Sequence, residues 1–195
     1  MTSVRRIAPL LVALGAVCLG GCLGKPEIED RWTRIDIAGS SVAPYQSITT
    51  GVPMTFAVRA AITYRAIHTG FAVAELRASN VDPATVDVEP GANRVRMAGE
   101  IDRILANSVS VGRATRAVTG WDHLIQHIDF TFVGTAPAAL DSTGAPPGLF
   151  LVCYLGSGVE MERADGTDSL IVTPFPSEAY ELLPVGLELN VAVAP

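Results

Sequence analysis

The feature that most constrains the fold is an alternation of apolar and polar residues with a period of two. Apolar side chains occupy every second position from Phe56 to Ala66, and arginine and threonine occur among the positions between them. Successive side chains of a β-strand point to opposite faces, so this segment predicts a strand that covers a core on one side. Residues 68–70 then indicate a turn, and residues 71–78 indicate a returning strand.

The same alternation recurs in three further segments, so the chain is expected to contain many short strands. These segments are residues 94–101, 124–132 and 187–193, and turn-forming residues occur at 81–83, 90–93, 142–148 and 164–168. The pattern predicts an all-β protein: an antiparallel β-sandwich, either immunoglobulin-like or of another Greek-key arrangement.

Three other segments are less clearly patterned. Ile101, Ile104 and Leu105 fit one helical turn, and residues 177–181 fit another, but neither is long enough for a parallel βαβ sheet. Residues 107–120 are open to two interpretations, a flexible loop or a strand edge that pairs with another protein.

Composition limits the classes of protein to which this chain can belong. Apolar residues make up 49% of its 195 residues and charged residues 17%, which favours a folded domain over intrinsic disorder. The formal net charge of −6 argues against a phosphate-binding surface, so no nucleic acid partner is expected. The length suits one ordinary domain.

The N-terminus has the three-part layout of a secretory signal peptide. Arg5 and Arg6 precede an apolar run over residues 7–21, which is shorter than the roughly 20 residues that cross a bilayer as a helix. The segment Leu19-Gly20-Gly21-Cys22 resembles the lipobox of bacterial lipoproteins, in which an aliphatic residue and two small residues precede a cysteine. A complete twin-arginine motif does not surround the arginine pair, and a basic n-region accounts for it.

The resemblance implies that the Cys22 thiol is alkylated by a diacylglyceryl group and that the peptide is cut before it. Two or three acyl chains anchor a protein firmly to a membrane. In this family an Asp after the lipidated cysteine tends to retain the protein at the inner membrane, and Leu23 therefore favours the outer membrane. The alternative is an ordinary signal peptide in which Cys22 is incidental. Cys18 is a poorer candidate for lipidation because Ala16 and Val17 precede it.

The expected organisation is a signal peptide at residues 1–21, a lipidated cysteine and tether at 22–31, and one β-sandwich domain at 32–195. Removing residues 1–21 removes two arginines and no acid, which leaves 12 basic and 20 acidic residues and a net charge of −8. Cys153 lies in an apolar run and is expected to be a buried core residue. With Cys22 lipidated, no intramolecular disulfide is expected.

The densest group of chemically active side chains lies between Trp121 and Asp129. On a helix His123 and His127 would share one face and suit zinc, but Leu124 stands where the zinc-protease motif has glutamate. On a strand His123, His127 and Asp129 would share the solvent face, and this exposed polar face is the favoured interpretation. No metal site is therefore predicted.

The remaining candidate sites are also better explained by structure than by chemistry. Residues 165–168 offer carboxylates that suit calcium, but a hairpin turn explains them equally well. No nucleophile motif or phosphate loop occurs, so no catalytic residue and no cofactor are predicted. Six arginines are expected to be exposed, on a solvated sheet face or on a partner-binding face. They are Arg59, Arg65, Arg94, Arg96, Arg113 and Arg116.

The sequence therefore predicts a lipoprotein of the outer membrane that acts as a non-enzymatic protein-binding or assembly module. Its partners would be the membrane, reached through lipidated Cys22, and an envelope protein that docks on a sheet face or edge. The alternatives are a lipoprotein that binds a small ligand or metal ion and, more distantly, an envelope hydrolase that uses Asp122, His123, His127 or Asp129.

Overall fold

The computed structural model describes residues 33–64, 68–121, 123–140, 144–162, 168–175 and 180–188. These residues belong to the second of two compact units in the chain, Met1–Arg31 and Trp32–Pro195. The predicted signal peptide, Cys22 and the predicted tether lie outside the described residues.

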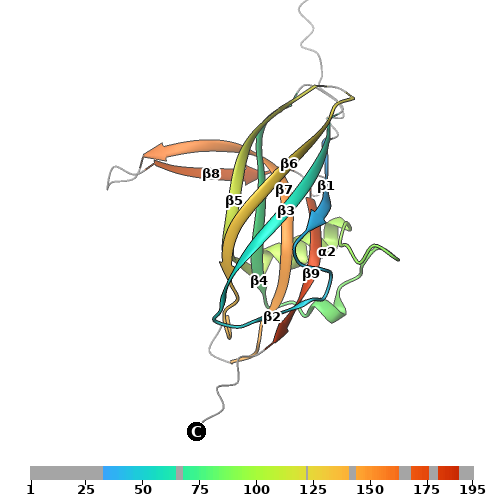
Figure 1. The fold of residues 1–195 in the computed structure, drawn as a ribbon, viewed down its shortest axis with the longest axis vertical. Coiled ribbons are helices and arrows are strands. Elements are labelled where there is room, and N and C mark those ends of the chain that lie inside the picture. Colours follow the sequence, from blue (N-terminus) through green and yellow to red (C-terminus); the bar gives the residue numbers. More distant parts are fainter. Residues whose placement is uncertain are drawn as a thin grey trace, which may run out of the picture. The chain divides into compact units, whose positions relative to one another are not determined.

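The described part of the chain is built almost entirely of strands (Figure 1). One α-helix, α2, and one short 3₁₀-helix, η1, occur between the fourth and fifth strands. The elements are β1 (Thr33–Ser40), β2 (Ser47–Thr49), β3 (Pro53–Tyr64), β4 (His68–Ser79), η1 (Pro83–Thr85), α2 (Ala98–Ala106), β5 (Ser108–Gly120), β6 (Ile125–Thr135), β7 (Gly148–Glu162), β8 (Asp168–Pro174) and β9 (Tyr180–Glu188).

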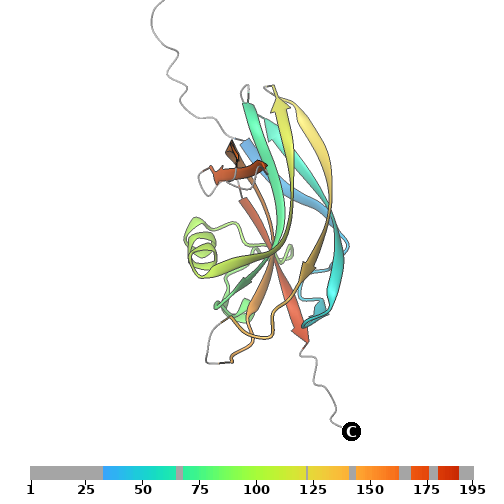
Figure 2. The same cartoon turned by 90° about the vertical axis from the view of Figure 1, so that its left-hand side faces the viewer.

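The strands form two sheets that pack face to face, so the predicted all-β sandwich is confirmed. The smaller sheet has the order β1-β3-β6, and the larger has the order β2-β9-β7-β4-β5, with β8 paired to the end of β7. All pairings are antiparallel except that of β2 with β9. Figure 2 shows α2 on the far side of the larger sheet from β1, β3 and β6.

The predicted alternation in β3 and β6 produces the core between the sheets. Every second side chain of β3 from Phe56 to Tyr64 is buried, and Ile128, Phe130 and Phe132 of β6 are buried opposite them. Phe56 and Phe132 are register partners, and their ring centroids are 5.4 Å apart. Because each strand buries one face and exposes the other, burial of apolar surface specifies this register.

The larger sheet is buried on both of its faces at β7, where residues 149–155 are all buried. One face contributes to the core between the sheets, and the other contributes Phe150, Val152 and Tyr154 to a second core beneath α2 and η1. A strand buried on both sides needs a continuous apolar sequence rather than an alternating one. The prediction that Cys153 is a core residue is confirmed, since its side chain is fully buried and free of disulfides.

The predicted strand over residues 94–101 is wrong beyond Val95. Val95 forms an isolated antiparallel bridge with Leu182, and helix α2 begins three residues later. Ile101 and Ile104 are fully buried against the larger sheet, so the spacing of three that suggested a helical turn belongs to a helix of nine residues. The segment from Val95 to Ile101 is too short to distinguish the period of two of a strand from the period of 3.6 of a helix, so its alternation indicated a strand where a helix begins.

Two predictions about β4 and β5 are also resolved. The predicted turn at residues 68–70 is wrong because these residues pair with Val118–Gly120 in the β4–β5 ladder, whereas the predicted returning strand over 71–78 is confirmed. The segment 107–120 is not a loop: β5 occupies nearly all of it and forms the outer strand of the larger sheet.

Predictions for the turns and for the C-terminal segment have mixed outcomes. The turns at 81–83 and 90–93 are confirmed, with Asp82 accepting a 2.9 Å hydrogen bond from the Ala84 amide. The suggested helical turn at 177–181 is wrong at Tyr180 and Glu181, which begin β9. Residues 177–179, and most of the predicted strand at 187–193, lie outside the described residues.

Candidate functional site

The histidine and aspartate group near Trp121 is divided between a turn and a strand. His123 lies in the turn before β6 with φ of 61°, whereas His127 and Asp129 lie on the exposed face of β6. Asp129 accepts hydrogen bonds of 2.7 and 3.0 Å from Arg59, and these bonds hold the pKa of the Asp129 carboxyl below its usual value. The predicted exposed polar face is thus confirmed for His127 and Asp129 but not for His123, which is outside the strand. Asp122 is outside the described residues.

Two other candidates lie where the structure gives little or no description. Residues 165–167 of the proposed calcium loop are not described, and Asp168 is described only as the first residue of β8. Among the residues that the structure describes, no group of three or more metal-ligating side chains converges. Arg65 is likewise outside the described residues.

The prediction that all six arginines are exposed is wrong for Arg94 and Arg96. The side chains of Arg94 and Arg96 are 31% and 25% exposed. Both arginines converge on the fully buried side chain of Glu181 in β9. Arg94 Nη1 lies 2.8 Å from Glu181 Oε1, and Arg96 Nη2 lies 3.1 Å from the same oxygen. The antiparallel bridge between Val95 and Leu182 places both arginines on the face that carries Glu181.

Glu181 connects the two sheets at the place where β1 borders β9. Its Oε2 accepts a hydrogen bond from the backbone amide of Ile37 in β1, and Arg96 also pairs with Asp36 of the same strand. No backbone ladder joins the described parts of β1 and β9, so this carboxylate satisfies an edge amide that a neighbouring strand would otherwise satisfy. Burial raises the pKa of Glu181, although the Ile37 amide, Arg96 and Arg94 oppose that shift.

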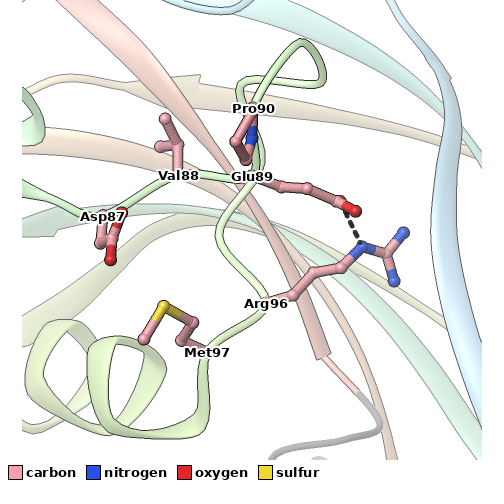
Figure 3. A pocket seen from close by; sticks show the side chains of 6 residues that line it. All are labelled: Asp87, Val88, Glu89, Pro90, Arg96 and Met97. Carbon is pink, nitrogen blue, oxygen red and sulfur yellow. Dashed lines mark ion pairs between the residues drawn. The ribbon is translucent and has the colours of Figure 1, made fainter.

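A pocket of about 370 Å³ lies beside this ion cluster, between the 87–90 segment and the start of α2 (Figure 3). Its lining combines apolar and charged side chains, and Arg96 Nε lies 3.3 Å from Glu89 Oε2 without the geometry of a hydrogen bond. The lining places the Asp87 and Glu89 carboxylates and the Arg96 guanidinium around one space, which is a set of groups that could hold a small polar ligand. The lining residues are Asp87, Val88, Glu89, Pro90, Arg96 and Met97.

A second buried ion pair lies beneath α2 on the outer face of the larger sheet. Arg77 Nη1 is 2.6 Å from Glu75 Oε1, and Arg77 also donates to the side chain and backbone oxygens of Ser108 at 2.7 and 3.0 Å. Tyr154 stacks on Tyr180 with centroids 5.2 Å apart, and burial raises the pKa of Tyr154 to about 12. Each of the three guanidinium nitrogens of Arg77 donates to a partner within the fold, which indicates a structural role for this arginine.

Sequence reasoning identified neither buried glutamate. The signal that could have identified them is a single acidic residue within an otherwise apolar run. The two runs are Tyr180-Glu181-Leu182-Leu183 in β9 and Ala74-Glu75-Leu76 in β4. A buried carboxylate needs a partner, but the sequence does not show which cation folds against it.

An exposed apolar group lies at the turn that joins β5 to β6. Trp121, Leu124 and Ile125 retain 59%, 40% and 60% of their exposure, and we call these three residues the apolar tip. The predicted strand over residues 124–132 therefore begins one residue late, at Ile125, and its first apolar residue is exposed. Leu124 precedes β6, and its backbone carbonyl accepts a 2.9 Å hydrogen bond from the Tyr64 amide. Backbone pairing at the end of β3 thus holds the turn in place while its large side chains face solvent.

No protein-family model matches the chain, and no curated protein matches its sequence. No helix in the described part of the chain is long and apolar enough to cross a bilayer.

Proposed function

We propose that this protein is an envelope lipoprotein, anchored in the outer membrane through acylated Cys22, whose β-sandwich serves as a non-enzymatic protein-binding or assembly module. The observation that carries the proposal is the segment Leu19-Gly20-Gly21-Cys22, placed after a basic n-region and an apolar run. Leu23 after the cysteine supports sorting to the outer membrane.

The asymmetry of the sandwich supports a docking role for the smaller sheet. The outer face of the larger sheet is covered by α2 and η1 and forms a second core there, whereas β3 and β6 present exposed outer faces. Arginine is enriched at protein interfaces, and this face carries Arg59. The exposed residues on this face are Thr55, Ala57 and Arg59 of β3 and His127, Asp129, Thr131 and Val133 of β6.

The first experiment tests the anchor. The full-length protein is purified from its native envelope in mild detergent, and the mass of its N-terminal peptide is determined. We expect a peptide that begins at acylated Cys22, and Cys22→Ala is expected to abolish both the acylation and the cleavage before residue 22. An unmodified wild-type N-terminus would refute the lipoprotein proposal.

A second experiment tests the docking face with two variants that add the same charge. Val133→Arg places an arginine on the exposed face of β6, and Ala106→Arg places one at the exposed end of α2, on the opposite side of the sandwich. We expect wild-type protein and Ala106→Arg to retain a stoichiometric envelope protein after crosslinking and mild-detergent purification, and Val133→Arg to lose it. Equal retention by both variants contradicts docking on this face.

The pocket beside Arg96 favours a second candidate, the binding of a small polar ligand. A volume of about 370 Å³ lies within the range that holds small molecules, and its lining offers both a guanidinium and carboxylates. Native mass spectrometry of the purified lipoprotein distinguishes the candidates. A protein that purifies without a protein partner but with a bound small molecule supports the second, and Arg96→Met is then expected to release that molecule.

A further inference from the structure

We infer that the apolar tip, Trp121, Leu124 and Ile125, inserts into the membrane interface and holds the sandwich upright on the lipid surface. This inference rests on the proposed anchor at Cys22 and extends it by naming a second contact with the same membrane. The occupant of the tip is thus a phospholipid surface and not a protein.

The clustering of the exposed apolar side chains is the first observation. In the described part of the chain, nine large apolar side chains are exposed, and three of them lie within the five residues from 121 to 125. The other six are dispersed over the fold, as is normal for surface apolar residues. The group combines tryptophan with two branched aliphatic side chains, the composition that favours the boundary between headgroups and acyl chains.

The position of the tip relative to the start of the domain is the second observation. Thr33, the first residue of β1, is the register partner of Tyr64, the last residue of β3. Tyr64 in turn exchanges backbone hydrogen bonds with the turn: its amide donates to the Leu124 carbonyl at 2.9 Å, and its carbonyl accepts from the His123 amide at 2.8 Å. The domain therefore begins at the end of the sandwich that carries the apolar tip.

Chain connectivity then limits how far this end lies from the proposed anchor. The eleven residues from Cys22 to Trp32 that precede Thr33 span at most about 40 Å when fully extended. Acylation at Cys22 would thus keep the tip at a high effective concentration beside the bilayer, where weak insertion of three side chains is sufficient.

The opposite end of the sandwich provides a matched control. Val52 is also an exposed aliphatic residue, and it precedes Pro53, which begins β3 at the end remote from Tyr64. The twelve residues of β3 at about 3.3 Å per residue separate the two ends by roughly 36 Å. The substitution Val52→Trp therefore reports on the end that the inference places away from lipid.

The test uses the full-length protein, acylated and reconstituted in phosphatidylcholine vesicles whose acyl chains carry bromine, which quenches tryptophan fluorescence on contact. The chain has two tryptophans, so Trp32→Phe leaves Trp121 as the single reporter. The control protein carries Trp32→Phe, Trp121→Phe and Val52→Trp. We expect brominated vesicles to remove roughly half of the Trp121 emission relative to unbrominated vesicles, as for a side chain in the acyl boundary, and to leave the emission of the control protein unchanged.

Removing the aliphatic part of the tip gives a second variant. In the Trp32→Phe background, Leu124→Ser with Ile125→Ser is expected to abolish quenching of Trp121 without changing the unfolding temperature, because both side chains are exposed. Equal Trp121 emission in both kinds of vesicle overturns the inference, as does equal quenching of Trp121 and of the control protein. Shielding of Trp121 that requires an envelope protein extract also overturns it, in favour of a protein partner.

The mass of the N-terminal peptide separates failure of the inference from failure of the proposed function. Acylated protein that floats with the vesicles but shows no Trp121 quenching refutes insertion of the tip and leaves the anchor intact. Protein with an unmodified Cys22 that does not float refutes both.

Discussion

Replacing Glu181 with alanine removes the group that joins β1 to β9. The fully buried carboxylate accepts the Ile37 backbone amide with one oxygen and pairs with Arg94 and Arg96 through the other, at 2.8 and 3.1 Å. Alanine leaves all three donors without this acceptor. Arg96 keeps Asp36, but the Ile37 amide and Arg94 have no replacement among the contacts that the structure describes.

The expected cost follows from the burial of this group. Removing one partner of a buried, hydrogen-bonded charge pair costs about 3–5 kcal/mol, because desolvated charge and an unsatisfied amide remain. For a domain of 150–250 residues each kcal/mol shifts the unfolding temperature by about 2–4 °C. The Glu181→Ala variant is therefore expected to unfold roughly 6–20 °C below the wild-type protein, a large part of the stability of an ordinary domain.

The measurement is thermal and urea unfolding of the full-length protein in mild detergent, followed by far-ultraviolet circular dichroism. Glu188→Ala is the matched control, because Glu188 lies on the same strand but is exposed, and it is expected to leave the transition unchanged. If Glu181→Ala shifts the transition no more than Glu188→Ala does, the carboxylate does not hold the two sheets together and the reasoning is wrong.

Three further predictions test the core and its charges. Burial raises the pKa of Glu181 in the folded protein above its unfolded value of about 4.3. The stability that Glu181 provides relative to glutamine is therefore fully present below the unfolded pKa, and it is lost as the pH rises through the folded pKa. The urea stability difference between wild-type protein and Glu181→Gln should thus be larger near pH 4 than near pH 7, and the reverse order contradicts it. Gly112→Ala places a Cβ 2.4 Å from the Val133 carbonyl oxygen and is expected to cost about 1–3 kcal/mol in urea unfolding, whereas Gly99→Ala meets no atom within 4 Å and should cost nothing. Burial raises the pKa of the Cys153 thiol, so N-ethylmaleimide should modify Cys153 only after unfolding, and rapid labelling at Cys153 itself in the native protein would contradict its burial.

Local sequence pattern predicted the strands that bury one face, and it predicted the burial of Cys153. The alternation in β3 places Phe56 and Ile62 in the core because side chains of a strand alternate between its two faces. The continuous apolar run around Cys153 likewise corresponds to a central strand covered on both sides. In both cases the information lies within neighbouring residues.

Pattern failed where the partner of a residue is distant in the chain. Arg94 and Arg96 look like exposed arginines, and only the bridge from Val95 to Leu182 brings them to Glu181, 85 to 87 residues away. The first turn of helix α2, residues 98–101, fits a period of two as well as a helix, and only packing against the larger sheet favours the helix.

The sequence by itself determined the all-β class, the faces of the best strands and the resemblance to a lipoprotein signal, because each depends on residues close together in the chain. The tertiary structure alone decided the order of the strands, the ion cluster around Glu181 and the placement of Thr33 beside the apolar tip. Those features depend on pairings between distant segments. Such pairings form only where the whole fold both buries its apolar surface and provides partners for its buried polar groups.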